Sequence, residues 1–446
     1  MGYYLADRNY TEQERGGKMT RKKYGFVNIS LWVLLLIPLF LTTQVFAQGN
    51  IRLGRLAVRG SLAYKIEFND NIYSEATDEV DDIIHIITPE ILFNYEGTPG
   101  NFLNFGYKGD FAAYSDNSDN NYQTHRPFID GGYKSPYGLY LLAGNYFMAT
   151  SDPYGSLNQF RLGVPQTKRW DNTLYGTLGY EFAEKYAVEG TYKYYVLRYE
   201  RDVDVWQDRT DNVYGGTLLY AITPKTALLA EYRRTDAEYV KQNDGAIDLA
   251  SSVITGTPVL WSSDTSQDYT LDDVYIGARF KPGGKISGQI KLGYQKKRFG
   301  NVRDVNGNLY QDQSTWAAET SVGYQLYSRT RFNFTLYRSI LGSPDLIASS
   351  YFDTQLGLDV SHGFRDNLIL YLGYFWGNND YQDVVAGFPE QEYNLNDVRV
   401  KFQWIIKEWL STSVQYKYKD KNATDDFYDS SNYSNNVVSG KIKARF

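Results

Sequence analysis

The sequence contains no cysteine and only three histidines. Without cysteine there can be no disulfide framework, no thiolate zinc site, no iron–sulfur cluster and no cysteine nucleophile. Three histidines leave little material for catalysis, and we expect neither a cofactor nor an enzymatic activity. Positive charge is also scarce, because 46 Lys and Arg stand against 52 Asp and Glu and the formal net charge is −6. Nucleic-acid binding, which needs a basic surface, is therefore not expected.

Long hydrophobic runs are missing after the first part of the chain. Four basic residues within 18–23 precede an apolar run over 31–41 and a small-residue cleavage motif at 45–47. This pattern is typical of a secretory signal peptide, here cleaved after Ala47. The run is shorter than the roughly 20 residues of a spanning helix, which disfavours an uncleaved anchor. We expect residues 1–47 to be an upstream extension and a signal peptide, with Met1 and Met19 both possible starts.

Tyrosine is abundant, with 42 residues in a chain whose aromatic content is 16%. From about residue 60 onward apolar and polar residues alternate, as in 103–111, 286–295 and 410–419. Alternation with period two places an apolar and a polar face on a β-strand. The runs are about 10–14 residues long, whereas a globular strand has about 5–6 and a tilted strand crossing a bilayer about 9–11.

Short and long connections alternate between these runs. Eight short turns and nine longer, acidic or Asn-rich loops can be distinguished. They predict an all-β fold, a transmembrane antiparallel up-and-down β-barrel of about 18 strands over residues 60–446. Residues 48–59 would form a short periplasmic segment, so we expect no plug domain. A soluble β-propeller or large sandwich is disfavoured because its strands would be shorter.

The last predicted strand ends in an aromatic residue. Val438, Gly440, Ile442, Ala444 and Phe446 share its apolar face. This face resembles the C-terminal signal that the barrel-assembly machinery reads, although Ala444 stands where an aromatic residue is often found. We therefore expect Phe446 to act as an assembly signal. Other aromatic residues gather near strand ends, as in the girdles at the two membrane interfaces.

The polar face of the strands would line the pore, because a barrel of about 16–18 strands is too wide for its own side chains to fill. Charges of both signs occur on most of this face. In the last three strands basic residues predominate, with Asp397 as their main counter-charge. These residues, which we call the basic sector, are Arg399, Lys401, Lys417, Lys419, Lys441, Lys443 and Arg445. The sector would bias the pore toward anions, unless its charges simply pair across strands.

Two further features leave alternatives open. The loop over 240–268 is the longest and is rich in apolar residues, so it would fold into the lumen or onto neighbouring loops. Whether the pore is open or blocked is not decided by the sequence. No Ser-His-acid spacing is visible, and an outer-membrane hydrolase centred on His125 is only a remote alternative.

The first predicted hairpin carries a motif. Its first strand ends in DNIY at 70–73, and its second strand reads DDIIHIITPEI at 81–91. The pattern resembles the family called putative β-barrel porin 2. The residues that carry the resemblance are Asp70, Asn71, Asp81, Asp82 and Pro89. Their expected roles are structural, because Asp and Asn side chains turn strand ends and proline cannot donate to a ladder.

The resemblance implies an outer-membrane channel of a Gram-negative bacterium. Family members often lie in exopolysaccharide or capsule loci and are thought to export the polymer. Export of an exopolysaccharide is thus one expectation, and a general or anion-biased diffusion porin is the other. The expected partners are outer-membrane lipid and lipopolysaccharide, the barrel-assembly machinery and a periplasmic polysaccharide-export protein. Tyrosines on the lumen face would contact carbohydrate: Tyr175, Tyr195, Tyr275, Tyr337 and Tyr371.

Overall fold

The computed structural model describes residues 51–152, 167–200, 207–239, 247–248, 259–260, 268–281, 283–300, 302, 309–343, 348–384 and 388–446. The expected signal peptide with its cleavage site, both possible start residues and most of the 240–268 loop lie outside these residues. Within the described part of the chain, no helix has the length and apolar character needed to cross a membrane.

Eighteen described strands form one antiparallel sheet that closes on itself. They are β2 (Leu56–Asn69), β3 (Asp82–Glu96), β4 (Phe102–Tyr114), β5 (Tyr122–Lys134), β6 (Leu139–Asp152), β7 (Thr167–Phe182), β8 (Tyr186–Tyr199), β9 (Arg209–Thr223), β10 (Thr226–Tyr239), β13 (Tyr269–Phe280), β14 (Ile286–Arg298), β15 (Gln313–Tyr327), β16 (Thr330–Gly342), β17 (Ser350–Arg365), β18 (Leu368–Gln382), β19 (Glu392–Lys407), β20 (Leu410–Ala423) and β21 (Tyr433–Arg445). The first and last strands of this series pair from Ser61–Arg445 to Asn69–Val437, so the sheet has no open edge. The predicted barrel is confirmed.

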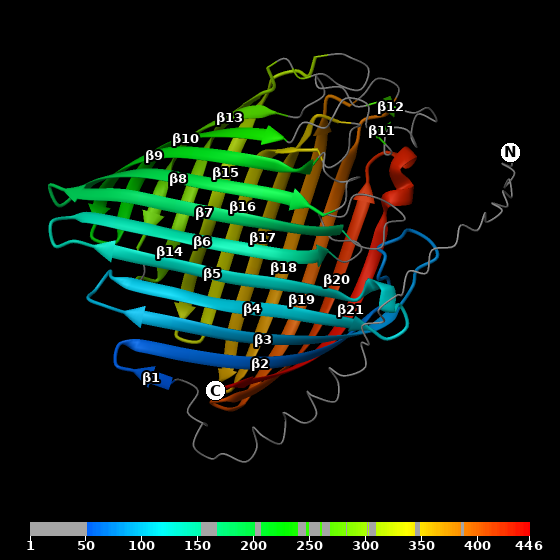
Figure 1. Ribbon diagram of the computed structural model, residues 1–446, viewed down its shortest axis with the longest axis horizontal. Helices are drawn as coiled ribbons and strands as arrows, with labels where there is room; N and C mark the ends of the chain where they lie inside the picture. Colours follow the sequence, from blue (N-terminus) through cyan, green and yellow to red (C-terminus); the bar gives the residue numbers. More distant parts are fainter. Residues whose placement is uncertain are drawn as a thin grey trace, which may run out of the picture. The chain divides into compact units, whose positions relative to one another are not determined.

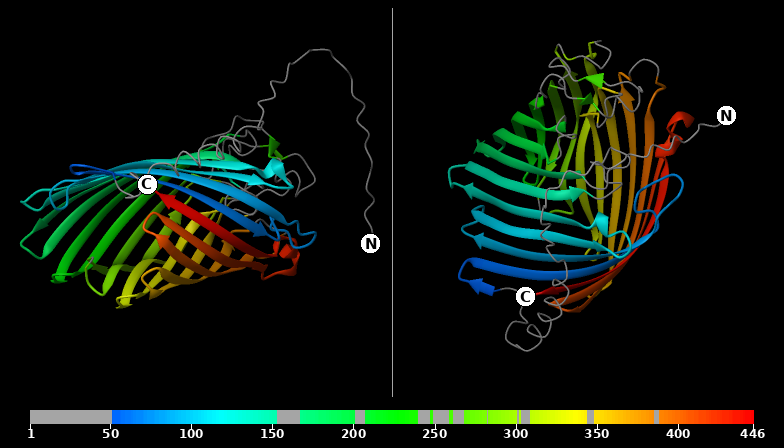
Figure 2. Two further views of the ribbon diagram at one scale, coloured as in Figure 1. Left: turned by 90° about the horizontal axis from the view of Figure 1, so that it is seen from below. Right: turned by 45° about the vertical axis from the view of Figure 1, so that its right-hand side comes forward.

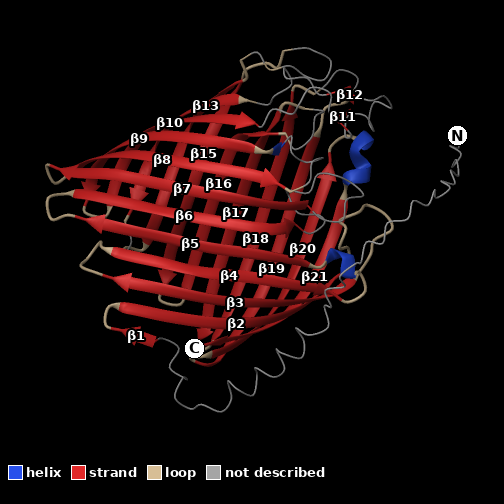
Figure 3. Ribbon diagram, in the orientation of Figure 1, coloured by secondary structure: helices blue, strands red, loops and turns tan. Residues whose placement is uncertain are grey.

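Short strands and helices lie outside the eighteen barrel strands. Strand β1 (Ile51–Leu53) folds back on the start of β2, and β11 (Ile247–Asp248) pairs with β12 (Val259–Leu260). The short helices η1 (Ser118–Asn120) and η4 (Asp426–Ser431) belong to long connections (Figure 3). Short turns gather at one end of the barrel, here called the turn end, and long connections at the other, here called the loop end. Ala183 and Glu184 both take positive φ angles, 48° and 59°, as a tight hairpin turn requires.

The closed sheet forms two layers that face each other. Strands β2 to β10 run across the front in Figure 1, and β13 to β21 run steeply behind them. The layers join where β10 pairs with β13 and where β2 pairs with β21. Figure 2 shows both layers from two other sides. The first and last barrel strands, far apart in the sequence, therefore lie side by side.

Strand alternation sorts side chains onto an outer and an inner face. On β2, Tyr64, Ile66 and Phe68 are exposed on the outer face, whereas Ser61 and Ala63 are buried on the inner face. An apolar outer face is what contact with lipid acyl chains requires. The predicted amphipathic pattern is thus present on this strand.

Six outer-face tyrosines form a belt near the loop end. Each tyrosine hydroxyl forms a hydrogen bond with a polar side chain on the next strand. That polar residue is not the direct cross-strand partner of the tyrosine but lies two positions from the partner, toward the loop end. The pairs are Tyr64–His85 (2.7 Å), Tyr107–His125 (2.8 Å), Tyr192–Asn212 (2.9 Å), Tyr232–Asp272 (2.7 Å), Tyr374–Asn396 (3.0 Å) and Tyr416–Asn436 (2.7 Å). Tyrosine suits a membrane interface because its ring is apolar and its hydroxyl is polar.

We expect this tyrosine belt to mark one boundary of the hydrocarbon layer. The chain has no cysteine, so a single introduced cysteine reports without background. In lipid nanodiscs, Asn394→Cys, on the loop-end side of the belt, should react with a membrane-impermeant maleimide. Val400→Cys, on the other side of the belt in the same strand, should react about ten-fold more slowly, because hydrocarbon excludes the polar reagent. Equal rates at the two positions would contradict this boundary.

Candidate functional site in the barrel lumen

The first residues of the hairpin motif form hydrogen bonds at the loop end across the barrel seam, which is the pairing of β2 with β21. The Asp70 carboxylate accepts hydrogen bonds from the Asn436 backbone N–H (2.6 Å) and side-chain amide (2.7 Å). The buried Asn71 side chain donates to the backbone carbonyls of Ser434 (3.0 Å) and Glu75 (2.8 Å). These bonds join the end of β2 to the start of β21, which are the two strands that close the barrel.

The second half of the motif organises the neighbouring loop. Asp82 accepts hydrogen bonds from the backbone N–H groups of Ser115 (3.0 Å), Asp116 (3.2 Å) and Asn117 (2.9 Å), whereas Asp81 is exposed. At Pro89 the ladder between β3 and β4 is interrupted without a shift of register. Within the described residues, no group of three His, Asp or Glu side chains could hold a metal ion. The arrangement around the motif is that of a structural element.

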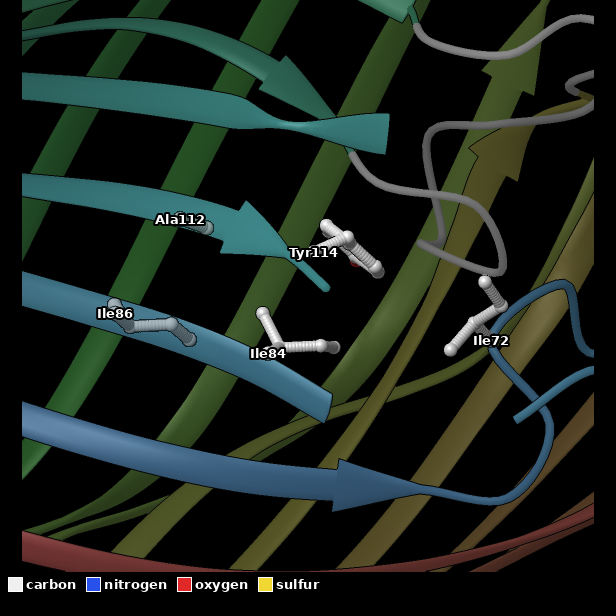
Figure 4. Packing of buried hydrophobic residues seen from close by; sticks show 5 residues of the cluster. All are labelled: Ile72, Ile84, Ile86, Ala112 and Tyr114. Atoms are coloured by element: carbon white, nitrogen blue, oxygen red, sulfur yellow. The ribbon is translucent and has the colours of Figure 1, made fainter. Parts of the chain in front are cut away.

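The connection after β2 also narrows the loop end of the lumen. Ile72 from this connection packs against Ile84, Ile86, Ala112 and Tyr114 on the inner face of β3 and β4 (Figure 4). All five side chains are at most 8% exposed. This part of the mouth is therefore covered by a packed apolar cluster.

One side of the lumen is filled by paired charges. Arg233 on β10 contacts Asp273 (2.7 Å) and Glu319 (2.5 Å), and Lys291 contacts Glu319 (2.6 Å) and Glu231 (3.2 Å). These residues belong to a set of ion-paired inner-face residues that we call the charged wall: Glu189, Glu231, Arg233, Asp273, Arg279, Lys291 and Glu319. Asp273 is 0% exposed, so this region is packed.

The contacts of the charged wall require a sharply curved sheet. Arg233 on β10 and Glu319 on β15 are separated by two intervening strands of the sheet. Two strands also separate Glu189 on β8 from Arg279 on β13, although their side chains lie 2.7 Å apart. Neighbouring strands are separated by about 4.8 Å, so a flat sheet would hold these residues too far apart. Curvature between β8 and β15 brings the charges together.

Inner-face residues elsewhere remain accessible to water. Tyr146 on β6 is 44% exposed. On the back layer the side chains of Asp359 and Arg399 are 53% and 45% exposed. Among the described residues, accessible inner-face side chains are thus found on β6 and on β17 and β19, whereas the charged wall spans β8 to β15.

The basic sector lies on the inner face of β19, β20 and β21, beside this accessible region. Arg399 and Lys417, which are direct cross-strand neighbours, share Asp397 at 3.2 and 2.9 Å. Lys443 reaches Glu90 on β3 at 2.8 Å, a contact that exists because the barrel is closed. Arg445 is exposed at the turn end. Three members of the sector thus have carboxylate partners.

Three other members of the sector have no such partner. Within the described residues, no carboxylate forms an ion pair with Lys401, Lys419 or Lys441. The Lys401 ammonium lies 3.9 Å from the centre of the Tyr371 ring. Lys441 is the direct cross-strand neighbour of Lys65 on β2. This part of the wall therefore keeps positive charge that ion pairs do not neutralise.

The expected lumen tyrosines occupy different surroundings. Tyr175 and Tyr371 are partly accessible on the inner face. Tyr275 is only 1% exposed, because it packs beneath Arg233 and Lys291 of the charged wall. The interpretation of Tyr275 as a contact for a solute is wrong for this reason. Tyr195 and Tyr337 are partly buried on the same side of the lumen.

The histidines belong to structural contacts. His85 and His125 lie on the outer face in the tyrosine belt, and His125 also meets the Phe111 ring edge-on. The Nδ1 atom of His362 lies 2.9 Å from the Thr330 hydroxyl near the turn end. His125 is thus bound to a tyrosine hydroxyl on the lipid-facing surface rather than placed in a Ser-His-acid group.

Comparison with known proteins finds one family whose model matches part of the chain. Residues 264–446 match the model of the family Putative beta-barrel porin 2. The match confirms the expected resemblance for this part of the chain, while the hairpin motif at 70–89 lies outside the matched range. No curated protein matches the sequence.

Several solved structures are similar to the chain at low sequence identity. OccK2 (OpdF) of Pseudomonas aeruginosa, solved in complex with glucuronate, has 11% identity and a TM-score of 0.43, with 87% of this chain and 98% of that chain covered. OpdK of the same organism has 10% identity, a TM-score of 0.42 and the same coverage. An OmpT of Vibrio cholerae lacking loop L8 has 11% identity and a TM-score of 0.33, with 90% and 100% covered.

The closed barrel and the family match together support a porin-like β-barrel channel in the outer membrane of a Gram-negative bacterium. The lumen combines a packed, charge-paired side with an accessible side that carries unpaired lysines. These two sides are the geometric basis for a proposal about what passes through.

Proposed function

We propose that this porin-like outer-membrane barrel exports an acidic exopolysaccharide, guided by the basic sector along the accessible side of its lumen. The observation that carries the proposal is the difference between the two sides of the lumen. Opposite charges neutralise one another in the charged wall, whereas Lys401, Lys419 and Lys441 have no ion-pair partner among the described residues. Unpaired lysines on a pore wall attract anions.

Keeping like charges on neighbouring strands has a cost. Arg399 opposes Lys417, and Lys65 opposes Lys441, in direct cross-strand positions. A like-charge pair is unfavourable by about 0.2–1 kcal/mol, although water in a wide lumen screens part of the repulsion. Asp397 bridges the first pair, and Glu67 lies 2.5 Å from Lys65, so of these four residues Lys441 is the one without a carboxylate partner in the described part of the chain. Its position beside Lys65 favours a role in passage.

The proposal is tested by removing the unpaired charges. The triple variant Lys401→Gln, Lys419→Gln and Lys441→Gln should keep the fold, since no ion pair is broken. In planar bilayers with a KCl gradient, its anion-to-cation permeability ratio should fall about two-fold or more, because the field on the pore wall weakens. A control removes three lysines at the turn end, Lys281, Lys285 and Lys407, which are exposed and outside the basic sector.

A secretion assay separates export from the alternative of a diffusion porin. Deleting the gene should abolish surface delivery of an acidic polysaccharide, and the triple variant should reduce it. If the triple variant changes ion selectivity while gene deletion leaves secretion intact, the protein is an anion-biased diffusion porin. An unchanged reversal potential in the triple variant would contradict any role of the basic sector in passage.

A role in export also predicts partners. A polymer must reach the barrel from the periplasm, so a periplasmic polysaccharide-export protein is expected to dock at the end where both termini of the barrel lie. The lipid-facing surface would contact outer-membrane lipid and, outside the tyrosine belt, lipopolysaccharide. Crosslinking from an introduced cysteine at the exposed Leu53 would test the first of these contacts.

A further inference from the structure

Four pairs of an aromatic residue and a glycine lie on the inner face of β4 to β7. In each pair the two residues are direct cross-strand partners. A Cβ atom added to the glycine would lie 2.1–3.0 Å from the ring of its partner, and at Gly106 the Ile91 carbonyl oxygen would be closer still, at 2.6 Å. The pairs and these distances are Gly132–Phe102 (2.4 Å), Gly106–Phe128 (3.0 Å), Gly179–Tyr140 (2.1 Å) and Gly144–Tyr175 (2.7 Å).

These distances define how the rings are oriented. Each ring occupies the space that a side chain at the glycine would fill, so it lies across the neighbouring strand. A ring that lies flat on a wall turns one face to the backbone and the other to the lumen. Glycine is the residue that permits such a close approach.

Three of the inner-face rings are nearly parallel and adjacent. The ring centres of Phe128 and Tyr146 are 5.9 Å apart with an interplanar angle of 15°, and those of Tyr146 and Tyr175 are 5.9 Å apart with an angle of 8°. We call these three residues the aromatic stack. It crosses β5, β6 and β7 on the accessible side of the lumen, and its central ring is 44% exposed.

A row of polar groups lies beside the aromatic stack. The Asn94 amide donates to the Asn104 side-chain oxygen (2.8 Å), and the Asn104 amide donates to the Asp130 carboxylate (3.0 Å). The Tyr146 hydroxyl donates a long hydrogen bond of 3.5 Å to Asp130. Hydrogen-bonding groups and aromatic faces thus adjoin one another across four neighbouring strands.

Sheet stabilisation explains part of this arrangement but not all of it. An aromatic ring over a glycine fills a gap in a strand, which accounts for the positions of Phe128 and Tyr175. Tyr146 is not the ring found over any of these four glycines. Its exposed ring therefore contributes little to filling the sheet, and burial does not explain why a large aromatic side chain stands in the lumen.

We propose that Phe128, Tyr146 and Tyr175, together with Asp130, bind a pyranose unit of a carbohydrate chain. A sugar ring has apolar C–H faces and a rim of hydroxyl groups. The C–H face would stack on the Tyr146 and Tyr175 rings, and the rim would donate hydrogen bonds to Asp130. The inference deepens the proposed function and rests on it for the identity of the polymer, whereas sugar binding itself can be measured separately.

The test is block of single-channel current by a defined oligosaccharide. Maltohexaose, which is neutral, should block the wild-type channel at a lower concentration than polyethylene glycol of similar hydrodynamic size. Tyr146→Ala should raise the half-blocking concentration of maltohexaose about five-fold or more, because a stacking face is lost. Tyr146→Phe, which keeps the ring, should stay within about two-fold of wild type, since the lost hydrogen bond is long and weak.

A matched control lies on the same wall. Thr177 is on the inner face of β7, two positions from Tyr175, and Thr177→Ala should leave block by maltohexaose unchanged. The inference is overturned if maltohexaose blocks no better than polyethylene glycol, or if Tyr146→Ala has no effect. It is also overturned if Thr177→Ala weakens the block as much as Tyr146→Ala does, because the effect would then be one of general channel damage.

An acidic probe separates this inference from the export proposal. Hexagalacturonate should lose affinity both in Tyr146→Ala and in the lysine triple variant, whereas maltohexaose should respond only to Tyr146→Ala. If gene deletion leaves secretion intact but maltohexaose block still depends on Tyr146, the export proposal fails and the sugar site stands. If secretion fails as expected but the block does not depend on Tyr146, the sugar site fails alone.

Discussion

Replacing Gly60 by valine is expected to remove most of the folded barrel. Gly60 and Phe446 exchange two backbone hydrogen bonds, of 2.8 and 2.9 Å, at the seam between β2 and β21. A Cβ atom at Gly60 would lie 2.3 Å from the Phe446 ring. The ring would have to leave the position in which it covers the seam. We expect the amount of barrel that migrates faster without boiling to fall about ten-fold or more.

A second glycine on the same seam provides the control. Gly440 also lies on the outer face, where an added Cβ would make an ordinary contact of 3.7 Å with Ile66. Gly440→Val should therefore assemble close to the wild-type level. Equal loss in both variants would mean that the seam tolerates no added bulk, and equal retention would mean that the Phe446 ring does not need its present position.

Refolding without cellular components separates two roles of Phe446. We propose that Phe446 acts both as an assembly signal and as the residue that closes the seam. If it were a signal alone, a variant lacking Phe446 would fail in cells but refold from urea into detergent micelles as well as wild type. If its ring closes the seam, the deletion and Gly60→Val should both refold poorly in micelles.

The alternation of residues predicted the strands because a closed barrel offers each side chain only two environments. The alternation of residues along a strand therefore decides whether a side chain lies on the inner or the outer face of the barrel. The length of each connection decides at which end of the barrel it lies. All eight short turns and nine long connections occur between the strands as expected. The first barrel strand begins at Leu56, where β1 folds back on it.

Contacts across the lumen could not be predicted in this way. Alternation places Arg233 and Glu319 on the inner face, but they are 86 residues apart, and only the curvature between β8 and β15 brings them together. The same limit applies to Lys443, whose partner Glu90 is 353 residues away. Asp397, which the sequence suggested as the main counter-charge of the basic sector, does pair with Arg399 and Lys417. Glu90, in contrast, was missed because strand closure is invisible to local pattern.

The cross-strand register brings aromatic residues next to glycines and belt tyrosines next to polar residues, and neither relation was predicted from the sequence. The aromatic–glycine pairs, such as Phe102–Gly132 and Tyr140–Gly179, join strands that are separated by a long connection, and so do the pairs of the tyrosine belt. Their register could therefore not be counted from a short turn. Whether Tyr146 is exposed could not have been obtained from register, because exposure depends on what fills the opposite side of the lumen.

Replacing Arg233 by leucine is expected to cause a large loss of stability. Arg233 forms ion pairs with Asp273 and Glu319. Asp273 is 0% exposed, and the Glu319 side chain is 24% exposed. Removing the guanidinium leaves two carboxylates close together on a packed wall. Breaking a buried ion pair in this way costs about 3–5 kcal/mol of unfolding free energy. Urea unfolding of the barrel in detergent micelles, followed by tryptophan fluorescence, measures the change.

An exposed ion pair at the turn end supplies the control. The side chains of Arg329 and Asp366 are 52% and 90% exposed. Arg329→Leu should leave the unfolding midpoint nearly unchanged, because water already solvates both charges. A comparable loss in this variant would show that leucine substitution, rather than the buried position, causes the effect.

A third variant distinguishes charge from packing in the charged wall. Adding Asp273→Asn and Glu319→Gln to Arg233→Leu removes the two carboxylates that the first substitution deprives of their arginine partner. If uncompensated charge is the main cost, this triple variant should be more stable than Arg233→Leu, since neutral amides are less costly to bury than ions. Lys291 would then lose Glu319 but keep Glu231, 3.2 Å away. A triple variant no more stable than Arg233→Leu would assign the stabilisation to the packing of the arginine side chain.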